Sequence, residues 1–132
     1  MKINTNSYTV SNGNKKLEYV YAFDDMKNRK SALERAVSIS KALPFSKTQI
    51  RVEDGNNFHD GTISNVYRTI ESEEGFINEY LNSSVYLVIM SGYYKETYVI
   101  LQLHLDLQKI YVCCDEQKSN LLDELEAYFN LN

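Results

Sequence analysis

Hydrophobic and polar residues alternate most regularly over residues 98–107, where the odd positions are one valine and four leucines. This period of two predicts a strand with one apolar and one mixed face. Residues 85–90 form a continuous apolar run, which is typical of a strand in the middle of a sheet. Residues 110–114 are short, β-branched and aromatic, which favours a third strand. Residues 85–114 therefore predict an antiparallel meander around which the rest of the chain is organised.

The register of the last two strands follows from keeping the leucines on one face. A turn at Leu107 and Gln108 would place Asp106 opposite Lys109. A longer loop with an even number of residues keeps the same faces, whereas a slip of one residue would turn every leucine to the wrong side. The other face is then predicted to carry His104 beside Tyr111 and Gln102 beside Cys113. We interpret this face as a candidate binding surface made of these side chains: Tyr98, Gln102, His104, Asp106, Tyr111 and Cys113.

The N-terminal region predicts a hairpin. Asn12-Gly13 separates residues 8–10 from residues 17–23, and this dipeptide favours a tight turn whose two central residues both need positive φ. The second strand has an apolar, aromatic side and a mixed side. We therefore expect two paired strands before the first helix.

A helix should follow the hairpin. Ser31 and Glu34 have the spacing of a capping box, although Asp24 or Asp25 could begin the helix earlier, and Pro44 ends it. One side is apolar and is expected to face the core: Ala32, Leu33, Ala36, Val37, Ile39 and Leu43. The opposite side is expected to face water: Glu34, Arg35, Ser38 and Lys41.

The remaining segments complete the predicted order. Residues 47–53 predict a strand, residues 73–81 a short helix, and residues 121–129 lie in a C-terminal amphipathic helix capped by Asp115 or Ser119. Residues 62–70 fit a helix by spacing and a strand by composition, and we favour the strand. The order ββαβ(β)αβββα predicts an α+β fold, a mostly antiparallel sheet with about three helices on one face.

Length and composition narrow the class of protein. The 132 residues are expected to form one α+β domain, residues 1–132, without disulfides or metal. The N-terminus lacks the apolar segment of a secretory signal, and no apolar run approaches the length of a membrane span. The adjacent Cys113 and Cys114 make no disulfide framework and are expected to be reduced. We therefore predict a cytoplasmic protein with no membrane association and no cofactor.

Charge is distributed unevenly. Residues 1–51 contain ten Lys and Arg against four Asp and Glu, whereas residues 52–132 contain four against fourteen. The halves could pack together and compensate each other, or the basic half could bind nucleic acid. The net charge of −4 argues against tight nonspecific binding to nucleic acid. The possible basic patch contains these residues: Lys15, Lys16, Lys27, Arg29 and Lys30.

Two short motifs suggest chemistry, and both have simpler explanations. His59-Asp60 resembles the centre of a metal motif, but a turn histidine followed by a turn aspartate accounts for it. Ser38 and Lys41 have the spacing of a serine nucleophile and its lysine, but they are predicted on a solvated helix face. Glycine-rich phosphate loops are absent from the sequence.

The leading functional hypothesis is a non-enzymatic protein-interaction module that acts by surface complementarity. An immunity or inhibitor protein, or an accessory subunit, would have this character, and the partner would be another protein or a second copy in a homodimer. The hypothesis depends on eleven tyrosines, no tryptophan and no catalytic set of residues. The alternatives are a nucleic-acid-associated regulator and a small enzyme with its site around His104.

Overall fold

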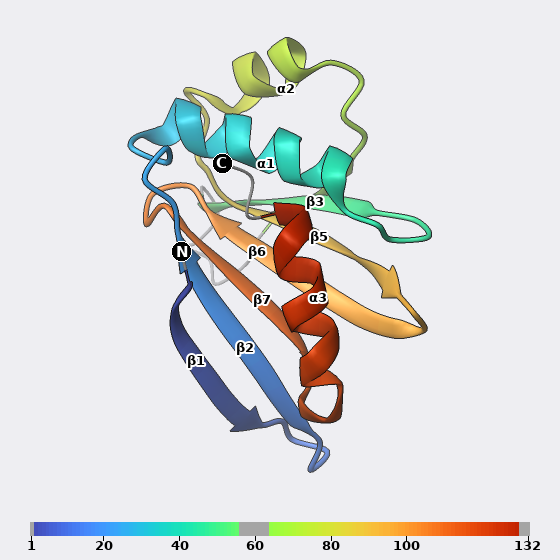
Figure 1. Ribbon diagram of the computed structural model, residues 1–132. Helices are drawn as coiled ribbons and strands as arrows, with labels where there is room; N and C mark the ends of the chain where they lie inside the picture. The colour runs from blue at the N-terminus through green and yellow to red at the C-terminus, as the bar shows by residue number, and fades with distance from the viewer. Residues whose placement is uncertain (1, 56–63, 130–132) are drawn as a thin grey trace.

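The computed structural model describes residues 2–55 and 64–129, and these residues form an antiparallel sheet of seven strands with three α-helices (Figure 1). The predicted α+β class and the arrangement of hairpin and meander are confirmed. Across the sheet the order is β1-β2-β7-β6-β5-β3-β4. The elements are β1 (Lys2–Thr9), β2 (Lys15–Ala22), α1 (Arg29–Ala42), β3 (Gln49–Asp54), β4 (Ser64–Arg68), α2 (Glu73–Tyr80), β5 (Val85–Tyr94), β6 (Thr97–His104), β7 (Lys109–Asp115), the 3₁₀ helix η2 (Glu116–Lys118) and α3 (Ser119–Phe129).

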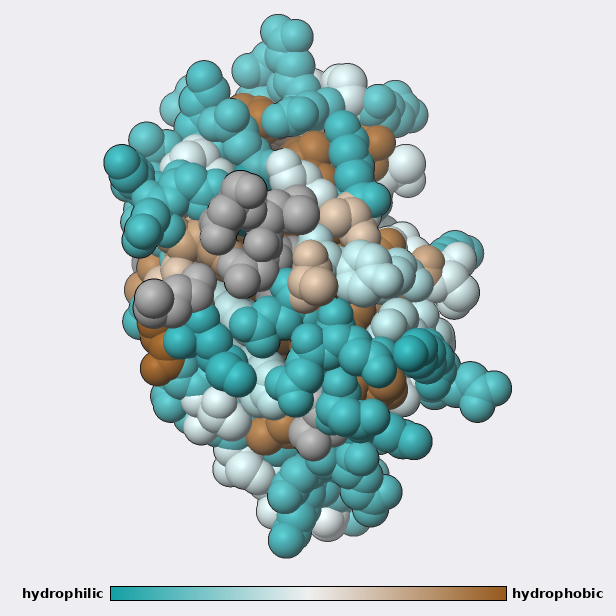
Figure 2. All heavy atoms as spheres, in the orientation of Figure 1, coloured by the Kyte–Doolittle hydropathy of each residue, from teal (hydrophilic) through white to brown (hydrophobic). Residues whose placement is uncertain are grey.

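All three α-helices pack on one face of the sheet. Figure 1 shows α3 lying over β6 and β7, and α1 crossing the upper end of the sheet with α2 beside it. Their apolar sides meet leucines, valines and isoleucines of the central strands in one buried cluster. Figure 2 shows mostly hydrophilic side chains on the outer surface of this side. In the described ranges, no helix combines the length and the apolar character needed to span a membrane.

The meander has the predicted faces, but the register of its last two strands differs from the one that a turn at Leu107 and Gln108 would give. His104 pairs with Lys109, and Leu103 pairs with Ile110, so β6 and β7 are joined by the four residues 105–108. The even loop length keeps the leucines of β6 in the core. Gln108 adopts a positive φ of 56°, and its N–H donates to the carbonyl of His104 at 2.9 Å. Leu107 was predicted on the apolar face, but it lies in this turn, is 59% exposed and is not part of the core.

The N-terminal hairpin is confirmed, with a longer turn than the dipeptide predicted. Residues 10–14 connect β1 to β2, and Gly13 alone has a positive φ, of 87°. The side chain of Asn12 accepts a hydrogen bond from the N–H of Asn14 at 3.0 Å, which gives an Asx turn in place of the tight primed turn. β1 also begins much earlier than residue 8 because its polar residues pair along β2.

Helix α1 begins at a capping box, but the cap is Asn28. Its side chain accepts from the N–H of Ser31 at 2.9 Å, and the hydroxyl of Ser31 accepts from the N–H of Asn28 at 3.0 Å. The predicted apolar stripe is buried. The prediction that Arg35 faces water is wrong, because its side chain is only 5% exposed. Its guanidinium is 2.6 Å from the carboxylate of Asp25 and lies over the ring of Phe23.

The ambiguous middle segment contains a strand, β4, as favoured, and it pairs with β3 at the sheet edge. Helix α2 is capped by Ser72, whose side chain accepts from the N–H of Gly75 at 3.0 Å. Glu73 and Glu74 lie in its first turn, where the helix dipole favours negative charge. β5 continues beyond the predicted residue 90 to Tyr94 and joins β6 through Lys95 and Glu96.

Candidate functional site

The strand registers place side chains in rows across the face of the sheet that lies opposite the helices. Residues paired across two neighbouring strands have side chains on the same face. Following these pairs from strand to strand therefore gives each row across the sheet. We call this the open face, since no described helix covers it. Its rows are Asn4, Val20, Tyr111, Gln102, Ile89, Arg51 and Tyr67; Asn6, Glu18, Cys113, Ile100, Ser91 and Gln49; and Ala22, Lys109, His104, Leu87, Glu53 and Asn65; Tyr8, Lys16, Asp115, Tyr98 and Tyr93 extend it at one end.

Tyrosines project from several strands of the open face. Tyr67, Tyr93, Tyr98 and Tyr8 are 61%, 56%, 44% and 42% exposed, so each ring contacts solvent over a large part of its area. Tyr93 and Tyr98 form a cross-strand pair with ring centroids 5.1 Å apart. A tyrosine ring offers apolar area and a hydroxyl that can hydrogen bond, which suits contact with another protein.

His104 lies half-buried on the open face, in the row at the opposite end from Tyr93 and Tyr98. Its ring meets the ring of Tyr111 edge-on, with centroids 4.9 Å apart. Burial lowers the pKa of His104 below its usual 6.5, while the carboxylates of Glu53 and Glu18 act in the opposite direction. The imidazole is therefore neutral at neutral pH, where it can both donate and accept a hydrogen bond.

A thiol and a phenol meet across strand β2. The hydroxyl of Tyr8 and the Sγ of Cys113 are 3.0 Å apart, and either group can donate. Burial raises the pKa of the Cys113 thiol above its usual value, and the hydrogen bond to Cys113 raises the pKa of Tyr8. Both groups therefore stay protonated at neutral pH, so Cys113 lacks the thiolate that a nucleophile requires.

Several charges on the open face are paired within the molecule. The Nζ of Lys16 is 2.6 Å from the carboxylate of Asp115, and this hydrogen bond raises the pKa of Lys16. Arg51 is 3.6 Å from Glu53, whose carboxylate also accepts from the hydroxyl of Tyr86 at 2.9 Å. The surface offered to a partner is therefore mainly aromatic and polar, with its charges partly compensated.

Of the six predicted binding residues, five share the open face, and Asp106 does not. Asp106 lies in the turn between β6 and β7, where its carboxylate is 3.5 Å from the guanidinium of Arg29. Sequence reasoning missed Tyr8, Tyr67 and Tyr93 as members of this surface. The first two come from the edge strands, whose place in the sheet depends on strand order, and Tyr93 from the part of β5 beyond its predicted end.

The predicted basic patch is not brought together. Lys15 and Lys16 begin β2, whereas Lys27, Arg29 and Lys30 lie beyond its other end, around the start of α1. The six β2 residues 17–22, at about 3.3 Å each, lie between the two groups. Arg29 also has a structural role, since its guanidinium donates to the carbonyls of Tyr80 and Ser83 at 2.8 and 3.0 Å.

The two short motifs contribute no described site. His59-Asp60 lies outside the described residues. Ser38 and Lys41 are exposed on α1, as predicted, and not in a cleft. Within residues 2–55 and 64–129, no three His, Cys, Asp or Glu side chains are grouped closely enough to hold a metal ion.

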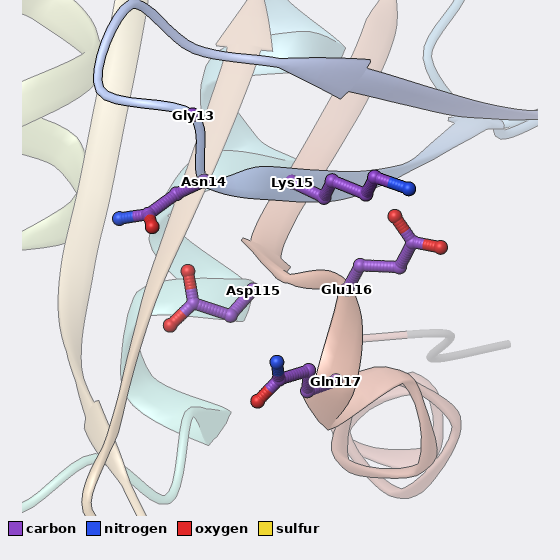
Figure 3. Close-up of a pocket in the computed structure, with 6 residues that line it drawn as sticks. All are labelled: Gly13, Asn14, Lys15, Asp115, Glu116 and Gln117. Atoms are coloured by element: carbon purple, nitrogen blue, oxygen red, sulfur yellow. The ribbon is translucent and has the colours of Figure 1, made fainter.

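A depression lies between the β1–β2 turn and the start of η2 (Figure 3). In Figure 3 the side chains of Asp115 and Gln117 point to the same side, and Lys15 extends toward Glu116. Asp115 is exposed and already paired with Lys16. The depression has the character of a solvated groove beside the turn, so we assign the candidate site to the open face.

Comparison with known proteins does not assign this chain to a class of protein. No protein-family model matches it, and no curated protein or solved structure does. The fold and the open face therefore carry the functional argument.

Proposed function

We propose that this protein is a non-enzymatic binding module that docks another protein on its open face. The observation that carries the proposal is the contrast between one face covered by three helices and a face on which four tyrosines, Tyr8, Tyr67, Tyr93 and Tyr98, remain exposed. An immunity-type inhibitor or an accessory subunit would act in this way, by covering a surface and not by changing a substrate.

The central rows of the open face favour binding over catalysis. Tyr111, Gln102 and Cys113 are half-buried between strands, so their positions are fixed before a partner arrives. The exposed rings of Tyr93 and Tyr98 stand at one end, where a partner can bury them. A neutral imidazole and a protonated thiol on an open sheet supply hydrogen bonds and no activated nucleophile.

The complementary partner is a protein surface with exposed apolar groups and hydrogen-bonding groups. A strongly charged partner would gain little, because Lys16 is paired with Asp115 and Arg51 with Glu53. A partner that places aromatic or aliphatic side chains against Tyr93 and Tyr98 would bury apolar area and keep the tyrosine hydroxyls hydrogen bonded.

The test is affinity capture from the native lysate with matched tyrosine variants. Tyr98→Arg puts a charge into the open face, and we expect it to release a partner that the unchanged protein retains. Tyr128→Arg is the control, because Tyr128 is similarly exposed, at 38%, but lies on α3 on the opposite side. Circular dichroism and thermal unfolding establish that both variants are folded.

The two variants separate docking on this face from binding elsewhere. Loss of the partner with Tyr98→Arg, and its retention with Tyr128→Arg, supports the proposal. A partner retained equally by both variants would overturn the proposal. A partner lost only with Tyr128→Arg would overturn it as well and would place docking on the helix side.

A further inference from the structure

Strand β1 presents a long free edge of the sheet. It is the first of the seven strands, pairs on one side with β2, and has no described strand on its other side. Seven of its eight residues are exposed, and no charged residue occurs between Ile3 and Thr9. Edge strands are usually protected against pairing by charge, proline or short length. Over this stretch β1 has none of these features, so its edge is suited to receive another strand.

The direction of the backbone groups of β1 follows from the hairpin. The N–H of Val10 donates to the carbonyl of Asn14, which makes this a hydrogen-bonded pair, and such pairs alternate along an antiparallel ladder. Asn4, Asn6 and Tyr8 therefore bond toward β2, while Thr5, Ser7 and Thr9 direct N–H and C=O outward. The N–H of Thr5 is consistent with this outward direction, since it donates to the side chain of its neighbour Asn4 at 2.9 Å and not to β2.

We propose that this edge pairs antiparallel with β1 of a second copy, around a two-fold axis at Asn6. A two-fold axis perpendicular to the sheet keeps each side chain on its own face, so odd residues must lie opposite odd residues and even opposite even. Centring on Asn6 gives the longest overlap beyond the irregular pairing between Lys2 and Asn4. Thr5 of one copy then lies opposite Ser7 of the other.

Charge at the two ends of β1 is complementary in this register. Lys2 extends over the ring of Tyr19, 3.9 Å from its centroid, and Tyr19 is the cross-strand neighbour of Thr5. The hydroxyl of Ser7 donates to the carboxylate of Glu116 at 3.2 Å, on the same side of the sheet. Since Thr5 faces Ser7 of the second copy, Lys2 of one copy and Glu116 of the other lie on the same side of the paired sheet, and we expect the Lys2 side chain to turn from Tyr19 toward that Glu116 carboxylate. The two-fold axis makes this contact twice.

The other edge of the sheet is less suited to such pairing. β4 has five residues, and Arg68 at its end is held 2.8 Å from Glu79 of α2. A short strand that ends in an arginine offers fewer backbone groups and carries a charge at its end. The two free edges therefore differ, and the pairing involves β1 with β1.

The paired dimer would be independent of a partner on the open face. Two copies related by this axis form one continuous sheet, with both open faces on the same side and Tyr8 of each beside Asn4 of the other. The inference does not rest on the proposed function, since it concerns backbone groups at the edge and not the tyrosine side chains of the face.

The first test is sedimentation equilibrium of the unchanged protein, Thr5→Pro and Thr5→Val. Proline removes an outward N–H, which an edge strand tolerates, while valine retains it. We expect concentration-dependent dimerisation that Thr5→Pro weakens about tenfold or more, because two intermolecular hydrogen bonds are lost, and that Thr5→Val preserves. An unchanged protein that stays monomeric at about 1 mM, or a dimer that Thr5→Pro leaves intact, would overturn the proposal.

A second test fixes the register even if Thr5→Pro does not fold. Non-hydrogen-bonded pairs have Cα atoms about 4.5 Å apart, within disulfide range, so Asn6→Cys should cross-link to its own copy under mild oxidation. Asn4→Cys should not, because that position faces Tyr8, and the unchanged protein controls for Cys113 and Cys114. Equal cross-linking of Asn4→Cys and Asn6→Cys, or none with Asn6→Cys, would contradict this register.

Exchange of the two charges tests the contact between copies. Lys2→Glu and Glu116→Lys should each weaken dimerisation by up to about fivefold, and the double exchange should restore it. Two single variants whose effects add in the double exchange, with no recovery, would rule out the contact between Lys2 and Glu116.

Discussion

The same strands make both faces of the sheet, yet the helix face is buried throughout its centre, while the open face combines buried residues such as Val20, Leu87 and Ile89 with exposed ones. On the helix face, Leu101 and Leu103 are fully buried under helices α1 and α3. On the open face, Gln102 and His104 alternate with them and remain half-exposed. Because successive side chains of a strand point to opposite faces, alternate residues of β6 stabilise the core and form the proposed binding surface. We therefore expect substitutions at neighbouring positions of β6 to have very different effects.

The largest expected effect is on the helix face. Leu103→Ala removes a fully buried side chain and leaves a cavity, so it should lower the free energy of unfolding by about 2–5 kcal/mol. Gln102→Ala, one residue away, should change it by no more than about 1 kcal/mol. Urea unfolding of both variants measures the difference. Similar losses at the two positions would mean that the open face is also part of a core.

A smaller effect is expected in the turn between β5 and β6, which belongs to neither face. Lys95 and Glu96 have φ of 47° and 66°, a region that costs residues other than glycine free energy. Glu96→Gly should raise the free energy of unfolding by up to about 1 kcal/mol. Thermal unfolding tests this, with Glu74→Gly in α2 as the control, which should destabilise. A loss of stability with Glu96→Gly would show that its side chain contributes more than the turn strain costs.

The smallest effect is expected from His104, on the open face. Its folded-state pKa is lowered by burial, so the folded protein binds fewer protons than the unfolded chain at mildly acidic pH. The contribution of His104 to stability is therefore fully present above its unfolded pKa of about 6.5 and is lost as the pH falls through the lower folded value. Urea unfolding between pH 7.5 and 5.5 should show a steeper loss for the unchanged protein than for His104→Gln. Identical pH dependence would exclude this role.

The sequence predicted the faces better than the edges. The odd-numbered apolar residues Val99, Leu101 and Leu103 identified the buried side of β6, because alternation is a local property of the chain. The register differed by two residues, since Gln108 adopts a left-handed conformation that widens the turn and that its residue type does not favour. β1 was predicted too short because its polar residues lack alternation and become a strand only through β2.

The candidate site could be predicted only where two strands joined by a short turn, β6 and β7, supplied it. His104, Gln102 and Tyr98 alternate along β6, so a shared face follows directly from the sequence. Tyr8 and Tyr67 reach the same surface from the two edges, which requires the order of all seven strands. The burial of Arg35 was missed for a similar reason, because its partners Asp25 and Phe23 precede the helix and do not appear on a helical wheel.

The pairing of β2 with β7 has a consequence for how the chain folds. These strands join residues about 90 positions apart, so the N-terminal hairpin can complete its side of the sheet only after nearly the whole chain is available. During synthesis β1 and β2 are made long before β7, so the backbone groups of β2 that pair with β7 stay accessible until β7 has been synthesised. Contacts this distant in sequence slow folding, so we expect the refolding rate to be limited by the docking of the first hairpin onto the last strand.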